Sequence, residues 1–133
     1  MTYGLDTSVV LRILTGEPAP LAASVVERIE RLCDEGNDFF VSDISVCEAY
    51  HAMQHFYGNT KEEAILALQA LSREPGFAFS AEAMDALGVP EAWKASPGFV
   101  DRMLAAEYAS RGYVTLSCEK SFRKLELAEV IRE

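Results

Sequence analysis

The chain has 133 residues, of which 50% are hydrophobic and 25% are charged, so that one domain could bury a sizeable core without disulfides. Its 12 basic and 21 acidic side chains give a formal net charge of −9, which argues against a protein that holds nucleic acid on a broad basic face. No apolar run reaches the roughly 18 residues of a membrane span, and the start of the chain lacks the features of a secretory signal; we therefore expect a single soluble, cytoplasmic domain over residues 1–133 that has no contact with a membrane.

The first half of the chain alternates short apolar segments with helical patterns. Asp6-Thr7-Ser8 supplies cap-type residues directly after a first strand, and Thr60 with Glu63 matches a capping box. Glycines close the predicted helices, as is common at helix C-termini. The expected elements are a strand at 2–5, a helix up to Gly16, a helix at 21–36, a strand at 39–41, a helix up to Gly58 and a helix after Thr60.

The second half of the chain continues the same alternation. The segment 88–98, with two prolines and two glycines, is the least regular stretch and predicts a loop or a broken helix. The other expected elements are a strand within 75–80, a helix over 81–87 capped by Ser80, a helix over 99–112, a strand at 113–118 and a short basic turn after it.

Strands that alternate with helices predict an α/β fold, a three-layer sandwich whose central parallel sheet of four or five short strands is flanked by helices. Ligands of such sheets bind beyond the carboxyl ends of the strands. Asp6, Asp43 and Glu119 each follow a predicted strand at that edge. We therefore expect the functional site at this edge of the sheet.

Four carboxylates could share one cleft at this edge. Asp6 and Glu119 follow strands, and Glu48 and Asp101 lie in the first turns of helices that begin nearby. Carboxylates this close together repel one another unless a cation or a shared proton is present. Oxygen ligands favour Mg²⁺ or Mn²⁺ over zinc, and such ions seek phosphate oxygens. The cluster indicates metal-assisted phosphodiester hydrolysis.

Four segments of the chain then suggest a family. LDTSVVLRIL, VSDISVCEAY, FVDRMLAAEYA and VTLSCEKSFRKL, in this order, resemble the four acidic blocks of the PIN-domain family, particularly the VapC-type toxins. The resemblance implies a metal-dependent endoribonuclease that is the toxin of a toxin–antitoxin pair. It also implies an RNA substrate, an antitoxin that occupies the acidic cleft, and a homodimer.

The resemblance assigns roles to individual residues. Asp6, Asp101 and Glu119 would be ligands of Mg²⁺ or Mn²⁺, and Glu48 would be a further ligand or would orient the attacking water. Ser8 would hydrogen-bond to Asp6, and we expect Thr7 and Ser121 to support the ligands in the same way. The predicted catalytic group is therefore Asp6, Glu48, Asp101 and Glu119.

The last block departs from the family pattern. The family usually has Asp-x-Asp-Phe where this chain has Glu119-Lys120-Ser121-Phe122, and Gly98 stands where many relatives have a further acid. Ser121 brings no negative charge, so we expect one bound ion rather than two. The same departure keeps open an alternative, a weak or inactive PIN-like module that acts by binding protein or RNA.

The basic residues Lys120, Arg123 and Lys124 directly follow Glu119. They could bind the RNA backbone at the rim of the cleft, or they could form a solvated turn.

His51 and His55 are four residues apart and so share a helix face. They could form a solvent-facing strip or could contact substrate phosphates, and a di-iron site is disfavoured because no second Glu-x-x-His pair exists.

Each acid also has a purely structural explanation. Asp6 could be a helix N-cap, and Glu48 could close a capping box with Ser45, although Ser42 competes as the cap. Asp101 could compensate the helix dipole, and Glu119 could be a solvated loop acid.

The three cysteines, an odd number without a CxxC pair, are expected to be reduced. A phosphatase with an aspartyl nucleophile is a poor fit, because Asp6 is followed by Thr7-Ser8 rather than by x-Asp.

Overall fold

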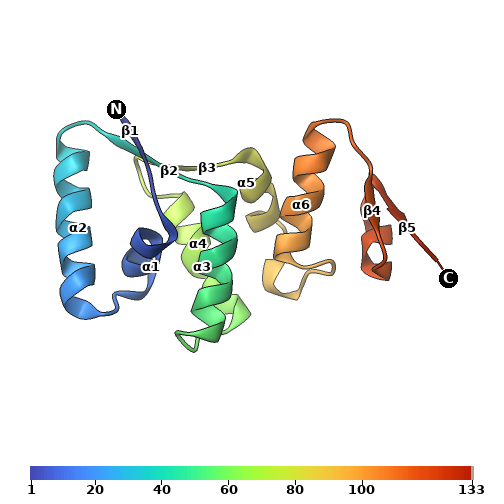
Figure 1. The fold of residues 1–133 in the computed structure, drawn as a ribbon, viewed down its shortest axis with the longest axis horizontal. Coiled ribbons are helices and arrows are strands. Elements are labelled where there is room, and N and C mark those ends of the chain that lie inside the picture. The colour runs from blue at the N-terminus through green and yellow to red at the C-terminus, as the bar shows by residue number, and fades with distance from the viewer. Residues whose placement is uncertain (133) are drawn as a thin grey trace. The chain divides into compact units, whose positions relative to one another are not determined.

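The computed structural model describes residues 1–132, which divide into two compact units (Figure 1). The first unit is Met1–Ser80, and the second runs from Ala81. The expected α/β fold with parallel strands is confirmed. Its five strands are hydrogen-bonded as two sheets, one of three strands and one of two. That the two units together form a single domain stays a prediction.

The first unit is a parallel sheet with four helices. Its strands pair in the order β1-β2-β3, with Tyr3 opposite Phe39 and Phe39 opposite Phe77. Each crossover between neighbouring strands contains two helices, as parallel pairing requires a long connection. The elements are β1 Thr2–Gly4, α1 Thr7–Thr15, α2 Ala19–Asp34, β2 Asp38–Val41, α3 Asp43–His55, α4 Lys61–Ser72 and β3 Phe77–Phe79.

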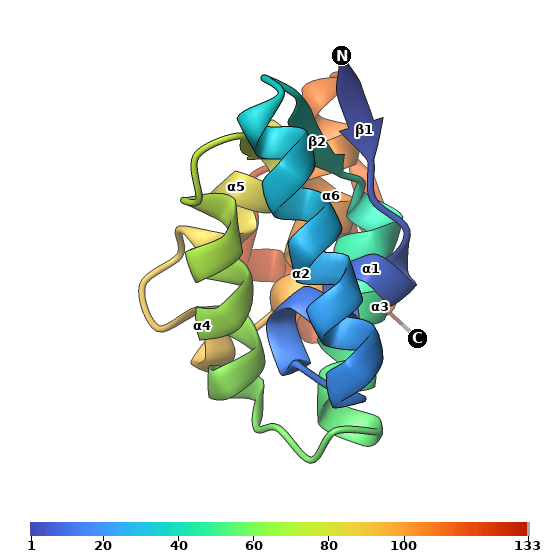
Figure 2. The same ribbon diagram turned by 90° about the vertical axis from the view of Figure 1, so that its left-hand side faces the viewer.

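The core of the first unit lies where the middle strand meets the helices. Phe39 on β2 is fully buried, and its ring lies 5.0 Å from that of Phe77 and 6.3 Å from that of Tyr3, measured between centroids. Helix α1 packs against α2, α3 and α4 (Figure 2), and Val10 and Val46 at these contacts are fully buried. Burial of this apolar surface is the main term that stabilises the unit.

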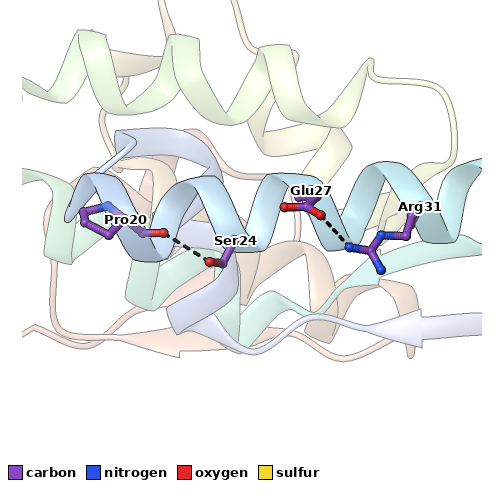
Figure 3. A network of polar contacts seen from close by, with 4 residues as sticks. All are labelled: Pro20, Ser24, Glu27 and Arg31. Carbon is purple, nitrogen blue, oxygen red and sulfur yellow. Dashed lines mark hydrogen bonds and ion pairs between the residues drawn. The ribbon is translucent and has the colours of Figure 1, made fainter.

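Helices α1 and α2 meet at a sharp bend. Gly16 ends α1 with a φ of 68°, a left-handed conformation that favours glycine. The outer face of α2 carries contacts within the helix (Figure 3): Ser24 Oγ donates to the carbonyl of Pro20 at 3.2 Å, and Arg31 pairs with Glu27.

Among the described residues, no single helix is long and apolar enough to cross a bilayer. Helices α1 and α2 taken together have the length and composition of a membrane span, but the pair is bent by 105°.

The second unit contains two helices, two short 3₁₀ turns and a two-stranded parallel sheet. Helix α5 packs against α6, and Phe99, Met103 and Phe122 are its largest buried hydrophobic residues. Strand β5 follows a turn and was not among the elements we expected from the sequence. The elements are α5 Ala81–Leu87, a 3₁₀ turn Ala92–Lys94, α6 Phe99–Ser110, β4 Thr115–Ser117, a 3₁₀ turn Lys120–Lys124 and β5 Ala128–Val130.

Candidate active site

Asp6 lies at the junction between β1 and α1, as predicted. It is the N-cap of α1, with an extended backbone (φ −72°, ψ 153°), and its side chain is exposed. Its Oδ2 accepts two hydrogen bonds from Ser8, one from the backbone N–H at 3.1 Å and one from the hydroxyl. The capping role and the expected partnership with Ser8 are therefore both present in the same residue.

The hydrogen bonds from Ser8 also favour the charged form of Asp6. The hydroxyl of Ser8 contributes most, its backbone N–H contributes next, and both lower the pKa of Asp6 below its ordinary value of 3.8. Donors stabilise the ionised form of a carboxyl group. Asp6 is consequently held as a carboxylate to lower pH than an unpartnered aspartate, and a carboxylate is the form that binds cations.

Glu48 lies in the second turn of α3, and its side chain reaches the start of α1. The hydroxyl of Thr7 donates to Oε1 of Glu48 at 2.7 Å, across 41 positions of the chain. Ser42 is the N-cap of α3 and accepts from the backbone N–H of Ser45. The cap of α3 is therefore Ser42 rather than Ser45, and Glu48 is held by a residue that directly follows Asp6.

A buried serine ties α3 to the chain just before Asp6. Ser45 is 7% exposed, and its hydroxyl donates to the carbonyl of Leu5 at 3.2 Å. The backbone N–H of Leu5 in turn donates to the carbonyl of Phe40 at 3.0 Å. The sequence indicates Ser45 only as a possible cap of α3, and its contact with Leu5 was not expected. The signal that could have found it is a serine on the apolar face of a helix, where a buried hydroxyl needs a partner.

The end of β2 carries a further acid, Asp43, at the first position of α3. Its Oδ1 accepts a hydrogen bond from the hydroxyl of Ser80, which directly follows β3. Burial raises the pKa of the neighbouring Cys47 thiol, and the charges of Asp43 and Glu48 raise it further. The carboxyl edge of the three-stranded sheet is thus lined by Asp6, Asp43 and Ser80, in the order of the strands.

Asp101 and Glu119 belong to the second unit. Asp101 is half-buried in the first turn of α6, and Glu119 is exposed directly before the 3₁₀ turn Lys120–Lys124. The backbone N–H of Glu119 donates to Oγ of Ser117 at 3.0 Å. Within residues 1–132, neither unit by itself gathers three His, Cys, Asp or Glu side chains in an arrangement that could hold a metal ion. That the four acids share one cleft stays a prediction.

The remaining predicted residues lie on the surfaces of the two units. Lys120, Arg123 and Lys124 are exposed on the 3₁₀ turn, and Ser121 between them is half-buried. His51 and His55 are exposed on α3, with ring centroids 6.2 Å apart. The two histidines therefore share the predicted helix face and form the expected solvent-facing strip.

Comparisons with known proteins and protein families identify the family of this chain. No curated protein matches the chain. One chain in the crystal structure of VapBC2 from Rickettsia felis, bound to a DNA fragment from their promoter, aligns with a TM-score of 0.44 at 16% identity, over 98% of each chain. The family model described as PIN domain matches residues 3–127, which includes every residue predicted for the site. The chain belongs to the PIN-domain family.

Proposed function

We propose that this protein is a divalent-cation-dependent endoribonuclease of the VapC type. Membership of the PIN-domain family supports a nuclease. The observation that carries the proposal is the junction after β1, where Ser8 donates two hydrogen bonds to Asp6 and lowers its pKa, and where Thr7 donates to Glu48. Two carboxylates fixed by consecutive residues of one helix start are preorganised, Asp6 as a ligand of the cation and Glu48 as a further ligand or as the group that orients the attacking water.

These residues fit the Mg²⁺ or Mn²⁺ that PIN-domain nucleases use. Both carboxylates are exposed, and neither forms an ion pair with a cationic side chain among residues 1–132. We assign Asp6, Asp101 and Glu119 as the residues that hold the cation. When it is bound, such an ion polarises a phosphodiester and makes water a better nucleophile at neutral pH.

The chain's own residues supply position and charge. Ser8 lowers the pKa of Asp6 and fixes the position of its carboxylate, and Thr7 orients the carboxylate of Glu48, which holds or aligns the attacking water. Ser121 would support Glu119 on the second unit without adding charge. Lys120, Arg123 and Lys124, which follow Glu119, are assigned to the RNA backbone. No side chain acts as a covalent nucleophile in this scheme.

An antitoxin is the protein partner that this chemistry favours. An acidic site is neutralised by a cation, and an inserted arginine or lysine of a partner can take the place of a metal ion. We therefore propose that the antitoxin covers the carboxylates. The resemblance to VapC-type toxins further supports a cytoplasmic protein that forms a homodimer. Exchange of Asp6 and Glu48 for lysine should release a copurifying partner, and a partner that stays bound would argue against this assignment.

The function is tested by incubating partner-free protein with a mixture of structured RNAs. We expect cleavage with Mg²⁺ or Mn²⁺ and none with EDTA, because the carboxylates need the cation to act. Cleavage that persists in EDTA would contradict a cation-dependent mechanism. Circular dichroism on the same preparation establishes that the protein is folded.

A second candidate function rests on the sequence of the last acidic block. Glu119 and Ser121 replace the two aspartates that the family usually carries, which favours a weak or inactive module that works by binding. The double variant Glu119→Asp/Ser121→Asp discriminates the two functions. A gain in cleavage of about tenfold or more would show that the natural site is impaired, whereas a natural protein that cleaves RNA at a rate that the double variant does not increase would favour the nuclease.

A further inference from the structure

The second unit contains a pocket at the carboxyl edge of its two-stranded sheet. The strands pair in parallel, with Ser117 opposite Val130, and the backbone N–H of Ile131 donates to the carbonyl of Ser117 at 2.8 Å. Both strands therefore end at the same edge, which is the usual place for ligands in parallel sheets. The pocket has a volume of about 540 Å³ and is lined by Cys118, Lys120, Arg123, Val130, Ile131 and Arg132; we name it the cationic pocket.

The lining residues of the cationic pocket carry positive charge only. Lys120 and Arg123 come from the 3₁₀ turn after β4, and Arg132 comes from the chain after β5. All three side chains are exposed, and none forms an ion pair with any residue in the described part of the chain. In a chain of net charge −9, three cations that line one pocket and have no ion pair within residues 1–132 indicate an anionic ligand.

The identity of the donors narrows the class of anion. Arginine presents a planar fork of N–H donors that matches two oxygens of a phosphate, and lysine adds a point charge. Val130 and Ile131 give the same pocket an apolar wall, against which the sugar of a nucleotide can pack. The volume lies within the usual range of about 300–1,000 Å³ for small-molecule sites. These features favour a phosphate that carries an organic group over a bare inorganic anion.

The position of the pocket along the chain suggests which phosphate it takes. Cys118 and Lys120, which both line the pocket, flank Glu119. We propose that the cationic pocket binds a backbone phosphate of the RNA substrate, next to the phosphodiester that is cut, with Arg132 as a substrate-binding residue in addition to Lys120 and Arg123. This inference rests on the proposed nuclease function. Lys124 belongs to the same basic run but does not line the pocket.

The first test measures binding of a fluorescent single-stranded RNA in EDTA, where the proposed cleavage is blocked. The double variant Arg123→Gln/Arg132→Gln should bind on the order of tenfold more weakly at 0.1 M salt, and the salt slope should fall by about 0.7 for each lost phosphate contact. Arg111→Gln is the matched control, because Arg111 is an exposed arginine of the same unit that pairs with Glu107. An unchanged affinity in the double variant, or an equal loss in the control, would overturn the proposal.

The second test uses the unmodified chain and so does not depend on how the variants fold. Cys118 and Cys33 are both exposed, and only Cys118 lines the cationic pocket. Saturating RNA should slow alkylation of Cys118 by N-ethylmaleimide severalfold and leave Cys33 unchanged. RNA that fails to bind, or that binds without protecting Cys118, would refute the proposal. Equal protection by inorganic phosphate at the same phosphate concentration would show a site for free anions instead.

These outcomes are separable from those that test the nuclease function. RNA that binds and protects Cys118 in a protein that does not cut with Mg²⁺ or Mn²⁺ would support the pocket and refute the nuclease. Cleavage by the wild-type protein together with unprotected Cys118 would support the nuclease and refute the pocket.

Discussion

Asp6 combines a structural and a proposed catalytic role in one side chain. As the N-cap of α1 it accepts the backbone N–H of Ser8, a contact that satisfies one of the free donors in the first turn of the helix. The same contact, with the hydroxyl of Ser8, lowers the pKa of Asp6. The structural explanation of Asp6 and the functional one are therefore compatible, because the donors from Ser8 that cap the helix also stabilise the charged form of the carboxylate.

Ser8→Ala tests the electrostatic part of this account. Because the hydroxyl of Ser8 is the largest cause that lowers the pKa of Asp6, its removal should raise that pKa towards the ordinary value. Asp6 would then be protonated at higher pH, and cleavage would be lost at a higher pH on the acid side of the profile. NMR titration of the Asp6 carboxyl carbon in metal-free protein measures the pKa.

Ser24→Ala is the control for this titration, because Ser24 donates to a helix carbonyl on the outer face of α2. It should leave the Asp6 titration where it is in the wild-type protein. Because the pKa of Asp6 is lowered in the folded protein, ionised Asp6 contributes to the stability of the fold at pH values above the pKa of an unfolded aspartate. This contribution is lost as the pH falls through the pKa of Asp6 in the folded protein. Identical Asp6 titrations in Ser8→Ala and the wild-type protein would remove the assigned role of Ser8.

Thr7→Val tests whether Thr7 positions Glu48. Valine keeps the shape of threonine but removes the hydroxyl that donates to Glu48, whereas Thr7→Ser keeps a donor. We expect Thr7→Val to lower kcat by about tenfold, the lower end for a lost partner of a metal or catalytic ligand, with little change in thermal stability. Steady-state RNA cleavage measures this effect, and equal rates for the valine and serine variants would contradict it.

Contacts between residues that are close in the chain could be predicted from the sequence. The Asp6–Ser8 contact follows from cap chemistry over two residues. The partner of Thr7 could not be found in this way, since Glu48 lies 41 positions away and only the folded helices bring the two together. The competition between Ser42 and Ser45 for the cap of α3 was also decided by geometry, in favour of Ser42.

At the scale of elements, the cap of α4 is the clearest local signal. The side chain of Thr60 accepts from the backbone N–H of Glu63 at 3.1 Å, and Glu63 accepts from the backbone N–H of Thr60 at 2.8 Å. This is the reciprocal capping box that the sequence predicts. It satisfies two donors that the first turn of a helix would otherwise leave without a partner.

Thr60→Ala should therefore lower the free energy of unfolding by about 1 kcal/mol. Thr60→Ser keeps the side-chain acceptor and should stay within a few tenths of the wild-type value. Urea denaturation followed by far-UV circular dichroism measures both variants. If the alanine and serine variants are equally stable, the capping box does not contribute as described.

The elements themselves could largely be predicted, because caps, glycines and apolar periodicity are local features. Strand β5, Ala128–Val130, was missed because two of its three residues, Ala128 and Glu129, are of types that are uncommon in strands. Its pairing with β4 forms the two-stranded sheet and creates the edge at which the cationic pocket lies. Arg132 could not be recognised as a candidate without that strand.

At the scale of the whole molecule, the chain divides into two units that each carry part of the proposed site. Asp6 and Glu48 lie in the first unit, and Asp101 and Glu119 lie in the second. The order of acidic blocks predicts that they act together, but such a cluster depends on long-range packing that periodicity and caps do not specify. The match of the PIN-domain model to residues 3–127, across both units, supports our proposal of one domain.

A single domain should unfold in one cooperative transition. Trp93 is the only tryptophan of the chain and lies in the 3₁₀ turn of the second unit, so its fluorescence reports that unit. Far-UV circular dichroism reports the helices of both units. We expect the two signals to follow coincident urea transitions, and separate midpoints would show that the units are independent domains.

The central claim is that Asp6 holds a catalytic cation, and the most direct test is RNA cleavage by Asp6→Asn. Asparagine is close to isosteric with aspartate and can still cap a helix, but it lacks the charge. Asp34→Asn is the matched control, since Asp34 is an exposed aspartate at the end of α2. We predict that Mg²⁺- or Mn²⁺-dependent cleavage falls by at least about 100-fold in Asp6→Asn and is unchanged in Asp34→Asn. Full cation-dependent cleavage by folded Asp6→Asn protein would contradict the account.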